Sequence, residues 1–280
     1  MKCKICKSAS THFFTKVDKW ELQKCENCGF VEVIQEPSTE ELKKIYSILY
    51  FQNIKYGDKK TQLKEYYYRL NLLKKYVPFN SNLLDYGCAQ ADFIDFAKNK
   101  YFFIGLDFST AAIEKAKEKY PHLKGDLYNL NNIDKIQDNS LEGVVMWDVI
   151  EHLWDPQEVV SSLLDKLKEN GYLFISTPKV DSFFANALKK FWPFMTPPEH
   201  LSFFSQASFK IFADVNHLEI VETRSKGKWV NVGFMFYKIK RIAPKLVPTV
   251  LINFFNLKYT SHLSLYAPTG DIQYLVFKKL

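Results

Sequence analysis

The middle of the chain, from residue 79 to about residue 226, alternates short apolar runs with stretches in which apolar residues recur every three or four positions. The runs SNLLDYG, YFFIGLD, LEGVVMWDV and GYLFIST have the length and apolar content of buried strands. The stretches ADFIDFAKNK, STAAIEKAKEKY and DPQEVVSSLLDKLKEN have the period of helices that bury one face. HLKGDL and LEIVETRSK predict two further strands. Such alternation is typical of a parallel sheet covered by helices on both faces.

Two flanking segments complete the predicted main domain. The run DIQYLVFKKL predicts a last, antiparallel strand at the edge of the sheet. Between it and the sixth strand, residues 228–269 are rich in bulky apolar side chains, and we interpret them as a helical cap insertion. Residues 37–78 are predicted to be a helical linker, with Ser38 or Thr39 as the N-cap and Pro78 as the stop.

Acidic residues stand at the predicted carboxyl ends of three successive strands, where open α/β sheets bind their ligands. Asp85 ends the first strand and opens a turn of small residues from Gly87 to Ala91. Asp107 ends the second strand 22 residues later, and a carboxylate in that place can accept both hydroxyls of a ribose. Asp126 ends the third strand. The spacing therefore predicts a crevice that binds a nucleoside.

Four of the five cysteines form two CxxC pairs near the start of the chain: Cys3 with Cys6, and Cys25 with Cys28. The 18 residues between the pairs are typical of two knuckles that hold one tetrahedral zinc ion. HFFTKV and WELQKC predict two strands between the knuckles, so residues 1–36 are predicted to be a zinc ribbon with a closed, structural site. The alternative is two unrelated cysteine pairs that are buried or redox-active.

Composition narrows the class of protein. With 47% apolar and 25% charged residues, the chain is typical of a soluble globular protein. It has no apolar run of about 18 residues and no apolar segment near its start, so we expect neither a membrane span nor a signal peptide. The odd number of cysteines and the CxxC pairs favour a reducing compartment such as the cytoplasm.

Charge is spread unevenly along the sequence. Residues 1–80 carry 15 Lys and Arg against 9 acids, residues 81–180 carry 10 against 16, and residues 181–280 carry 13 against 6. The insertion at 228–269 has six basic residues and no acid among its aromatic and aliphatic ones. That mixture favours either a cap that packs on the core or a segment that rests on an anionic membrane.

Several motifs occur in order over roughly residues 65–226: LLDYGCAQADF, FFIGLDFSTAAIEKAKEK, KGDL, SLEGVVMWDVIEHLWDPQEVVSSLLDKLKENGYLFISTP and PPEHLSFFS. In these motifs the chain resembles class I S-adenosylmethionine-dependent methyltransferases. The WDVIEHLWDP block and the later PPEHLSFFS resemble the small-molecule branch that includes the ubiquinone-biosynthesis O-methyltransferases. The resemblance implies an α/β fold over residues 79–280, with a Rossmann-like sheet of seven strands that is parallel except for one antiparallel edge strand.

The resemblance also implies contacts to S-adenosylmethionine. They are Asp85 and Gly87 for the methionine part, Asp107 for the ribose diol, Asp126 for the adenine amino group, and Trp147 and Asp148 beside the methyl group, with Ala89, Phe108 and Leu127 completing the set. The family usually has glycine where Ala89 and Ala91 stand. Because alanine does not easily adopt a positive φ, we expect the cofactor to fit if both alanines are helical.

Two histidines, His152 and His200, lie where methyl transfer to oxygen needs a proton acceptor. His200, in a proline-rich loop, is our candidate general base, and the alternative is a histidine that caps a helix or packs. In the ubiquinone-type enzymes the positions of Asp148, Glu151 and His152 hold a divalent cation, so the resemblance implies such a site. Metal-free relatives share the same block.

These features predict an enzyme that methylates a small molecule or a glycan at oxygen, such as a lipid-linked or nucleotide-linked sugar. A second hypothesis is an RNA base methyltransferase whose ribbon binds RNA. Nucleic acid is not the expected partner, because Trp147 to Ile150 stand where amino-group base methylators carry an Asn/Asp-Pro-Pro-aromatic motif. A third hypothesis is a non-catalytic, zinc-containing interaction module that has lost its cofactor.

Overall fold

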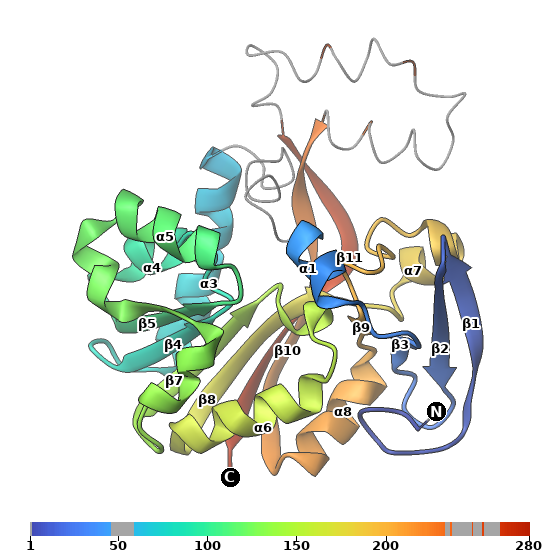
Figure 1. Ribbon diagram of the computed structural model, residues 1–280, viewed down its shortest axis with the longest axis horizontal. Coiled ribbons are helices and arrows are strands. Elements are labelled where there is room, and N and C mark those ends of the chain that lie inside the picture. The colour runs from blue at the N-terminus through green and yellow to red at the C-terminus, as the bar shows by residue number, and fades with distance from the viewer. Residues whose placement is uncertain (1, 46–58, 233–235, 237–247, 249–253, 255–263) are drawn as a thin grey trace.

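The structure is a computed structural model that describes residues 2–45, 59–232, 236, 248, 254 and 264–280 of the 280-residue chain. Two sheets organise these residues (Figure 1). A seven-stranded sheet with helices on both faces forms the main body, and a four-stranded sheet contains the N-terminal segment. Within the described ranges, no helix is long and apolar enough to cross a membrane.

The main sheet has the strand order β10-β11-β8-β7-β4-β5-β6. Its strands are β4 (Asn82–Tyr86), β5 (Phe102–Asp107), β6 (Leu127–Asn129), β7 (Leu141–Trp147), β8 (Leu167–Pro178), β10 (Leu218–Asn231) and β11 (Ser264–Lys279). The strands from β8 to β6 run parallel, whereas β11 is antiparallel to both of its neighbours. The predicted fold class is confirmed. The antiparallel strand lies one place in from the edge because β10 pairs along its outer side.

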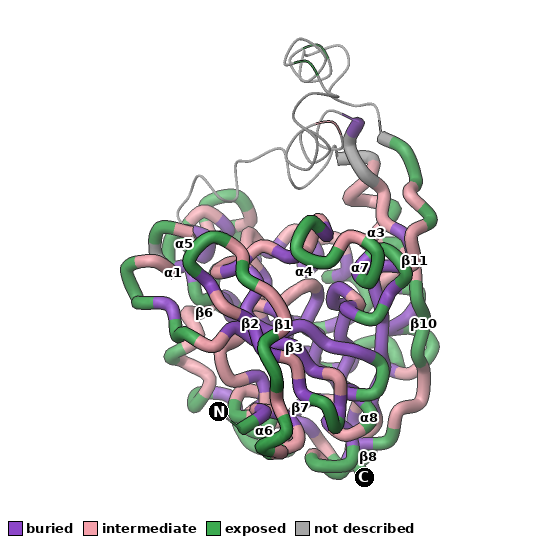
Figure 2. Tube along the Cα trace, turned by 90° about the vertical axis from the view of Figure 1, so that its right-hand side faces the viewer, coloured by how far each residue is buried: buried purple, intermediate pink, exposed green. Residues whose placement is uncertain are grey.

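Helices cover both faces of this sheet, and the central strands between them are buried (Figure 2). One face carries α6 (Pro156–Lys166) and α8 (Gln206–Val215), and the other carries α3 (Lys59–Tyr76), α4 (Asp92–Ala97) and α5 (Thr110–Lys119). Shorter elements are α1 (Thr39–Ile45), α7 (Phe183–Leu188) and the 3-10 turns η2 (Pro121–Asp126), η3 (Leu130–Lys135), η4 (Ile150–His152) and η5 (Lys189–Phe191).

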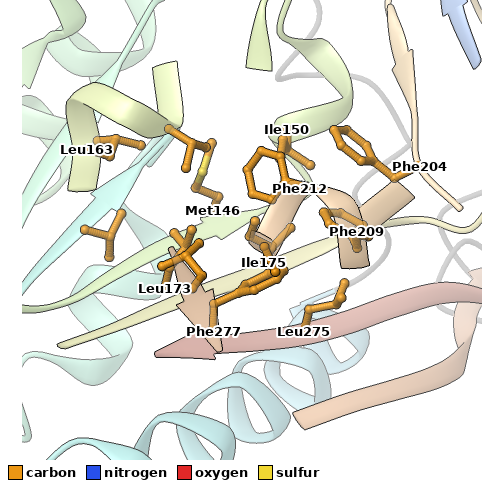
Figure 3. Close-up of a cluster of buried hydrophobic side chains, with 14 of the residues drawn as sticks. Met146, Ile150, Leu163, Leu173, Ile175, Phe204, Phe209, Phe212, Leu275 and Phe277 are labelled. Carbon is orange, nitrogen blue, oxygen red and sulfur yellow. The ribbon is translucent and has the colours of Figure 1, made fainter. Parts of the chain in front are cut away.

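Aromatic packing holds α8 against the main sheet (Figure 3). The rings of Phe209 and Phe212 both contact Phe277 of β11, and Phe204 stacks on Phe209 with ring centroids 4.4 Å apart. All four rings are fully buried. Burying each such side chain contributes about 1.5–3 kcal/mol to folding. The cluster therefore fixes the position of Phe204, just before α8, relative to the main sheet.

Two predicted elements differ from those found. The helix predicted over DPQEVVSSLLDKLKEN ends at Lys166, and β8 begins at Leu167. Asn170 has a left-handed φ of 62° and Gly171 follows it, so this stretch turns instead of continuing the helix. The strand predicted over HLKGDL is displaced: residues 122–126 lie in the 3-10 turn η2, and only the last residue, Leu127, belongs to the strand β6.

The predicted cap and linker are only partly described. β10 continues past residue 228 and β11 begins before residue 269, so the ends of the predicted insertion belong to the sheet. Most of the remaining insertion lies outside the described residues. The linker predicted over 37–78 contains the helices α1 and α3, as expected. Residues 46–58, between them, lie outside the described residues.

The N-terminal segment, residues 2–36, is called the ribbon below. Its strands are β1 (Thr11–Val17), β2 (Trp20–Cys25) and β3 (Val31–Val33), and all pairs in its sheet are antiparallel. The fourth strand of that sheet, β9 (Ser202–Phe203), comes from far along the chain. The ribbon and the main body are therefore joined through one sheet.

Candidate active site

The carboxyl ends of β4 and β5 bring two acids to one edge of the main sheet. Asp85 pairs with Gly105 in the parallel ladder, and Asp107 ends β5 two residues further on. Both side chains are buried. Burial raises the pKa of Asp85 to about 7; Arg69 opposes this shift and Asp107 adds to it. Burial likewise raises the pKa of Asp107, while backbone amides that donate to its carboxylate oppose the shift.

The turn after β4 approaches Asp107 closely. Gly87 has a φ of 85°, and a Cβ there would meet Val149 Cγ2 at 2.5 Å, so only glycine fits. Ala89 and Ala91 have left-handed φ values of 48° and 60°, so the condition under which we expected the cofactor to fit, that both alanines are helical, is not met. The turn keeps the left-handed geometry although it lacks the glycines, and the Ala89 amide donates to Asp107 Oδ2 at 2.8 Å.

Asp126 does not lie where the sequence analysis placed it. It is the last residue of η2, before β6 begins, and it lines a cavity with residues from the amino ends of other strands, such as Asn82 and Phe102. The predicted contact to adenine is thus not supported by its position. Leu127 is fully buried in the core. The cause is the shift of the third strand to the residues after KGD.

Asn129 takes the place at the end of β6. It pairs with Asp107 in the ladder, and its Nδ2 donates to the Phe108 carbonyl and to Thr110 Oγ1, both at 3.1 Å. Phe108 is partly exposed at the rim. Sequence reasoning missed Asn129, and the polar run after Leu127 was the available signal.

Trp147 and Asp148 lie at the end of β7, as predicted, next to an arginine that the sequence analysis missed. Arg69 of α3 donates from Nη2 to Asp148 Oδ2 at 2.7 Å, and its guanidinium lies 5.3 Å from the Trp147 ring centroid. Burial opposes ionisation of Asp148, but Lys228 and Arg69 lower its pKa. Asp148 is therefore held as a carboxylate by cations from two elements.

Glu151, His152 and His200 converge beside this carboxylate. The two imidazole rings are 4.8 Å apart, and all three side chains offer ligand atoms within 4.8 Å of one another. Within the described part of the chain, Glu151 Oε2 has no hydrogen-bond partner. Burial and then the charge of Asp148 raise the pKa of Glu151 to about 8. Of the cation set predicted as Asp148, Glu151 and His152, the structure groups Glu151 and His152 with His200.

Backbone carbonyls fix the tautomer of both histidines. His152 Nδ1 lies 2.6 Å from the Glu199 carbonyl, and His200 Nδ1 lies 2.7 Å from the Phe194 carbonyl. A carbonyl can only accept, so each Nδ1 must donate and carry a proton. In the neutral ring Nε2 is then the basic atom, suited to take a proton or to bind a cation.

The four ribbon cysteines form one cluster. Cys3 Sγ lies 3.6 Å from Cys28 Sγ, Cys6 Sγ lies 3.4 Å from Cys25 Sγ, and all four sulfurs lie within 4.8 Å of one another. Disulfides are excluded at these distances, because an S–S bond is about 2.05 Å long. A zinc ion with bonds of about 2.3 Å to four thiolates requires sulfurs about 3.8 Å apart. The cluster therefore fits a zinc ion.

A seven-stranded sheet of this order, with Asp85 and Asp107 at adjacent strand ends, is the architecture of class I S-adenosylmethionine-dependent methyltransferases. The family described as "Methyltransferase domain" matches residues 59–223, more than half of the chain, and the chain belongs to this family. Residues 59–223 are thus a methyltransferase domain.

Individual relatives match shorter stretches. A Mycolicibacterium smegmatis protein named as a probable S-adenosylmethionine-dependent methyltransferase is 35% identical over 101 residues, which make up 35% of this chain and 38% of that protein. The mitochondrial ubiquinone biosynthesis O-methyltransferase of Candida albicans is 34% identical over 109 residues, or 34% of this chain and 32% of that enzyme. The alignments therefore span only about a third of each relative's length.

Solved structures share the fold at low sequence identity. A methyltransferase from Methanosarcina mazei has a TM-score of 0.51 at 14% identity, covering 75% of this chain and 97% of its own. The YcgJ protein from Bacillus subtilis has a TM-score of 0.52 at 15% identity, covering 76% and 98%. At such identity the likeness establishes the fold alone.

Proposed function

We propose that the enzyme transfers the methyl group of S-adenosylmethionine to an oxygen atom of a small molecule or a glycan. The observation that carries this proposal is the histidine pair of buried His200 and half-buried His152, with both Nδ1 atoms hydrogen-bonded to backbone carbonyls. A hydroxyl acceptor must lose a proton during transfer, and a neutral imidazole accepts it near neutral pH. The partial match to the Candida albicans O-methyltransferase also supports oxygen as the acceptor.

The crevice residues would hold the cofactor and align the reaction. S-adenosylmethionine supplies an electrophilic methyl group on a positively charged sulfur. Asp85 and the Gly87 turn would bind its methionine part, Asp107 would accept the ribose hydroxyls, and Phe108 would lie against the adenosine. Trp147 would exclude water beside the methyl group, where in-line displacement needs the acceptor atom held at about 3–3.5 Å.

The same histidines would suit a divalent cation together with Glu151. Two imidazoles and one carboxylate are a common ligand set. Glu151 Oε2, which is buried and has no hydrogen-bond partner among the described residues, would gain one from the cation. A cation there would lower the pKa of an acceptor hydroxyl. We expect turnover to fall on dialysis against a chelator and to return with Mg²⁺ or Mn²⁺ if the cation is used. Full turnover after chelation would assign the histidines to proton transfer alone.

Zinc in the ribbon would be structural. Four thiolates close the coordination shell, so the ion has no open position for water or substrate. We expect about one zinc per chain by metal analysis, with Cys25→Ser lowering that content and Cys88→Ser, outside the cluster, leaving it unchanged. A wild-type chain purified without zinc, iron or any other thiolate-binding metal would contradict the proposal.

The partner surface that we propose is an anionic membrane, contacted through α7 and η5. Phe183 is 78% exposed and Phe191 is 49% exposed, and the exposed Lys189 and Lys190 lie between them. Aromatic side chains and lysines together favour an interface with anionic lipid. A lipid-linked sugar would then meet the crevice at this surface. Sedimentation with anionic vesicles that is lost in Phe183→Ser and weakened by salt would support the membrane; a protein that stays in the supernatant at low salt would not.

The decisive experiment identifies the acceptor. Incubating the enzyme with S-adenosylmethionine that carries a deuterated methyl group and a fractionated cell extract labels the product for mass spectrometry. We expect a labelled O-methyl small molecule or glycan, with His200→Gln lowering turnover by about 10²–10⁴-fold and the remote His122→Gln leaving it unchanged. A labelled RNA base, with a salt-sensitive RNA mobility shift, would instead favour the RNA hypothesis.

A further inference from the structure

The loop that carries His200 is built into the ribbon sheet. The strand β9 begins two residues after His200 and pairs with β3 through Val31–Phe203 and Glu32–Ser202. The Val33 amide adds a hydrogen bond of 3.0 Å to the Leu201 carbonyl. Position and direction of the backbone at residues 200–203 are therefore set by a strand of the ribbon.

The segment from Glu151 to Trp154 is bound to the other side of this loop. The Leu201 amide donates to the Glu151 carbonyl at 2.7 Å, and Ser202 Oγ donates to the Leu153 carbonyl at 2.9 Å. Both carbonyls flank His152. Hydrogen bonds thus join the segment that carries His152 to the segment that carries His200 at β9, the outer strand of the ribbon sheet. This accounts for the close approach of the two imidazole rings.

Each cysteine knuckle also contacts one of these segments directly. Lys4, between the two cysteines of the first knuckle, donates from Nζ to the Trp154 carbonyl at 2.8 Å and lies over the Trp154 ring. In the second knuckle, the Cys28 carbonyl accepts a hydrogen bond of 3.0 Å from Ser205 Oγ. Lys4 is mostly buried and lies 3.9 Å from the buried carboxylate of Glu32. These contacts are polar and directional, so they fix orientation as well as proximity.

We propose that the ribbon is a positioning element for the methyl-transfer site, with Lys4 and Ser202 as the residues through which it sets the spacing and orientation of His152 and His200. The inference rests on the proposed function only where it assigns chemistry to these rings. The positions of the rings can be tested without an acceptor. Lys4 contacts neither cofactor nor acceptor in this proposal, and acts through the Trp154 backbone.

The test compares Lys4→Met with Lys16→Met by histidine NMR. Methionine keeps the aliphatic packing of lysine but donates no hydrogen bond, and Lys16 is an exposed ribbon lysine that pairs only with Glu21 among the described residues. The readout is the position of the imidazole Cε1–Hε1 cross-peaks, assigned with His→Gln variants. We expect Lys4→Met to move the signals of His152 and His200, and Lys16→Met to move neither.

Two further measurements separate positioning from simple damage. In Lys4→Met, zinc content and affinity for S-adenosylmethionine should match the wild type within about twofold, since the site around Asp85 is unchanged. Lys4→Arg should restore the wild-type positions of both cross-peaks, because arginine can also donate a hydrogen bond to the Trp154 carbonyl. If Lys4→Met does not fold, Ser202→Ala repeats the test through the Leu153 carbonyl. If the cross-peaks of His152 and His200 keep their wild-type positions in every folded variant, the proposal is overturned, whatever the rate of methyl transfer. The rate of methyl transfer tests the proposed function instead.

Discussion

At the scale of single residues, the cofactor turn is held in a conformation that its sequence does not favour. Ala89 and Ala91 have left-handed φ values, a region that costs an L-residue roughly 1–2 kcal/mol. The compensating contact is the hydrogen bond from the Ala89 amide to Asp107. Strain of this kind is typical of functional sites, where the surrounding structure over-determines the backbone.

Ala89→Gly should therefore stabilise the protein. Glycine adopts the left-handed region without strain, and after its larger entropy in the unfolded chain is counted we expect a gain of about 0.5–1 kcal/mol in the free energy of unfolding by urea denaturation. The control is Ala111→Gly on the exposed face of α5, which should lower stability by a similar amount. Equal losses in the two variants would contradict the left-handed assignment at Ala89.

Affinity for S-adenosylmethionine should depend on pH through Asp85. Its pKa is raised to about 7, so a falling pH neutralises the carboxylate that would bind the cationic methionine part, and affinity should weaken up to about tenfold per pH unit below 7. Rising pH has the opposite effect on the stability of the ligand-free protein. Because folded Asp85 holds its proton more tightly than the unfolded chain, its contribution to stability falls as pH rises from about 4 to 7.

Calorimetric titration between pH 5.5 and 8 would measure this dependence. Asp85→Asn should weaken binding and remove the pH dependence below 7. Asp126→Asn is the matched control, because that acid lies at the amino end of β6, and it should change neither affinity nor profile. An Asp126→Asn variant as weak as Asp85→Asn would restore Asp126 to the crevice.

At the scale of elements, α3 is linked to the end of β7 by a partly buried ion pair. Arg69 reaches Asp148 from the face of the sheet opposite to α6 and α8. The sequence of the helix, KKTQLKEYYYRLNLLKKY, is only weakly amphipathic, so its apolar packing alone specifies its position poorly. The ion pair between Arg69 and Asp148 fixes the position of α3 relative to β7. The position of α3 over the crevice thus depends on this contact.

Removing one partner of the pair should cost more than removing both. Arg69→Met leaves the partly buried carboxylate of Asp148 short of one cation, and we expect a loss of about 1.5–3 kcal/mol in the free energy of unfolding, with Lys228 limiting the loss. Adding Asp148→Asn should recover part of that loss in a double-mutant cycle. The exposed pair of Lys117 and Glu114 serves as control, and its removal should change stability by about 0.5 kcal/mol or less.

The same elements mark the limit of what the sequence could predict. Asp85 and Asp107 were found because apolar strands end abruptly at a carboxylate, a local signal. Asp126 was misplaced because KGDLYNL allows two strand registers, and only pairing with β5 selects the later one. Arg69 gave no signal, since its role arises from α3 packing over a strand end 79 residues away.

At the scale of the whole molecule, most of the architecture was predictable and the connection between its parts was not. The strand and helix alternation gave the main sheet, and the cysteine spacing gave the ribbon. The two-residue strand β9 has no sequence signal of its own, because its register depends on β3. The meeting of Glu151, His152 and His200 follows from that pairing and could not be read from their separate motifs.

Removing the zinc ion that we propose for the ribbon should consequently lower amide protection outside residues 2–36 as well. By hydrogen exchange with mass spectrometry, we expect a chelator to lower amide protection in β2 and β3 and also in residues 199–205, because β3 and β9 share hydrogen bonds. The strands β4 and β5, which belong to the main sheet and pair with no strand of the ribbon sheet, should keep their protection. Restoring zinc should reverse the change; loss confined to residues 2–36 would show that the loop holds its shape alone.

The pairing of β3 with β9 also limits the use of the ribbon as an isolated domain in another protein. Cut away from the main body, β3 would present a bare row of amides and carbonyls beside Val31 and Val33, which are covered in the intact chain. An uncapped edge of that kind recruits further strands, so the excised piece would self-associate even with its metal bound. A grafted version would need its own surrogate for Ser202–Phe203 to remain monomeric.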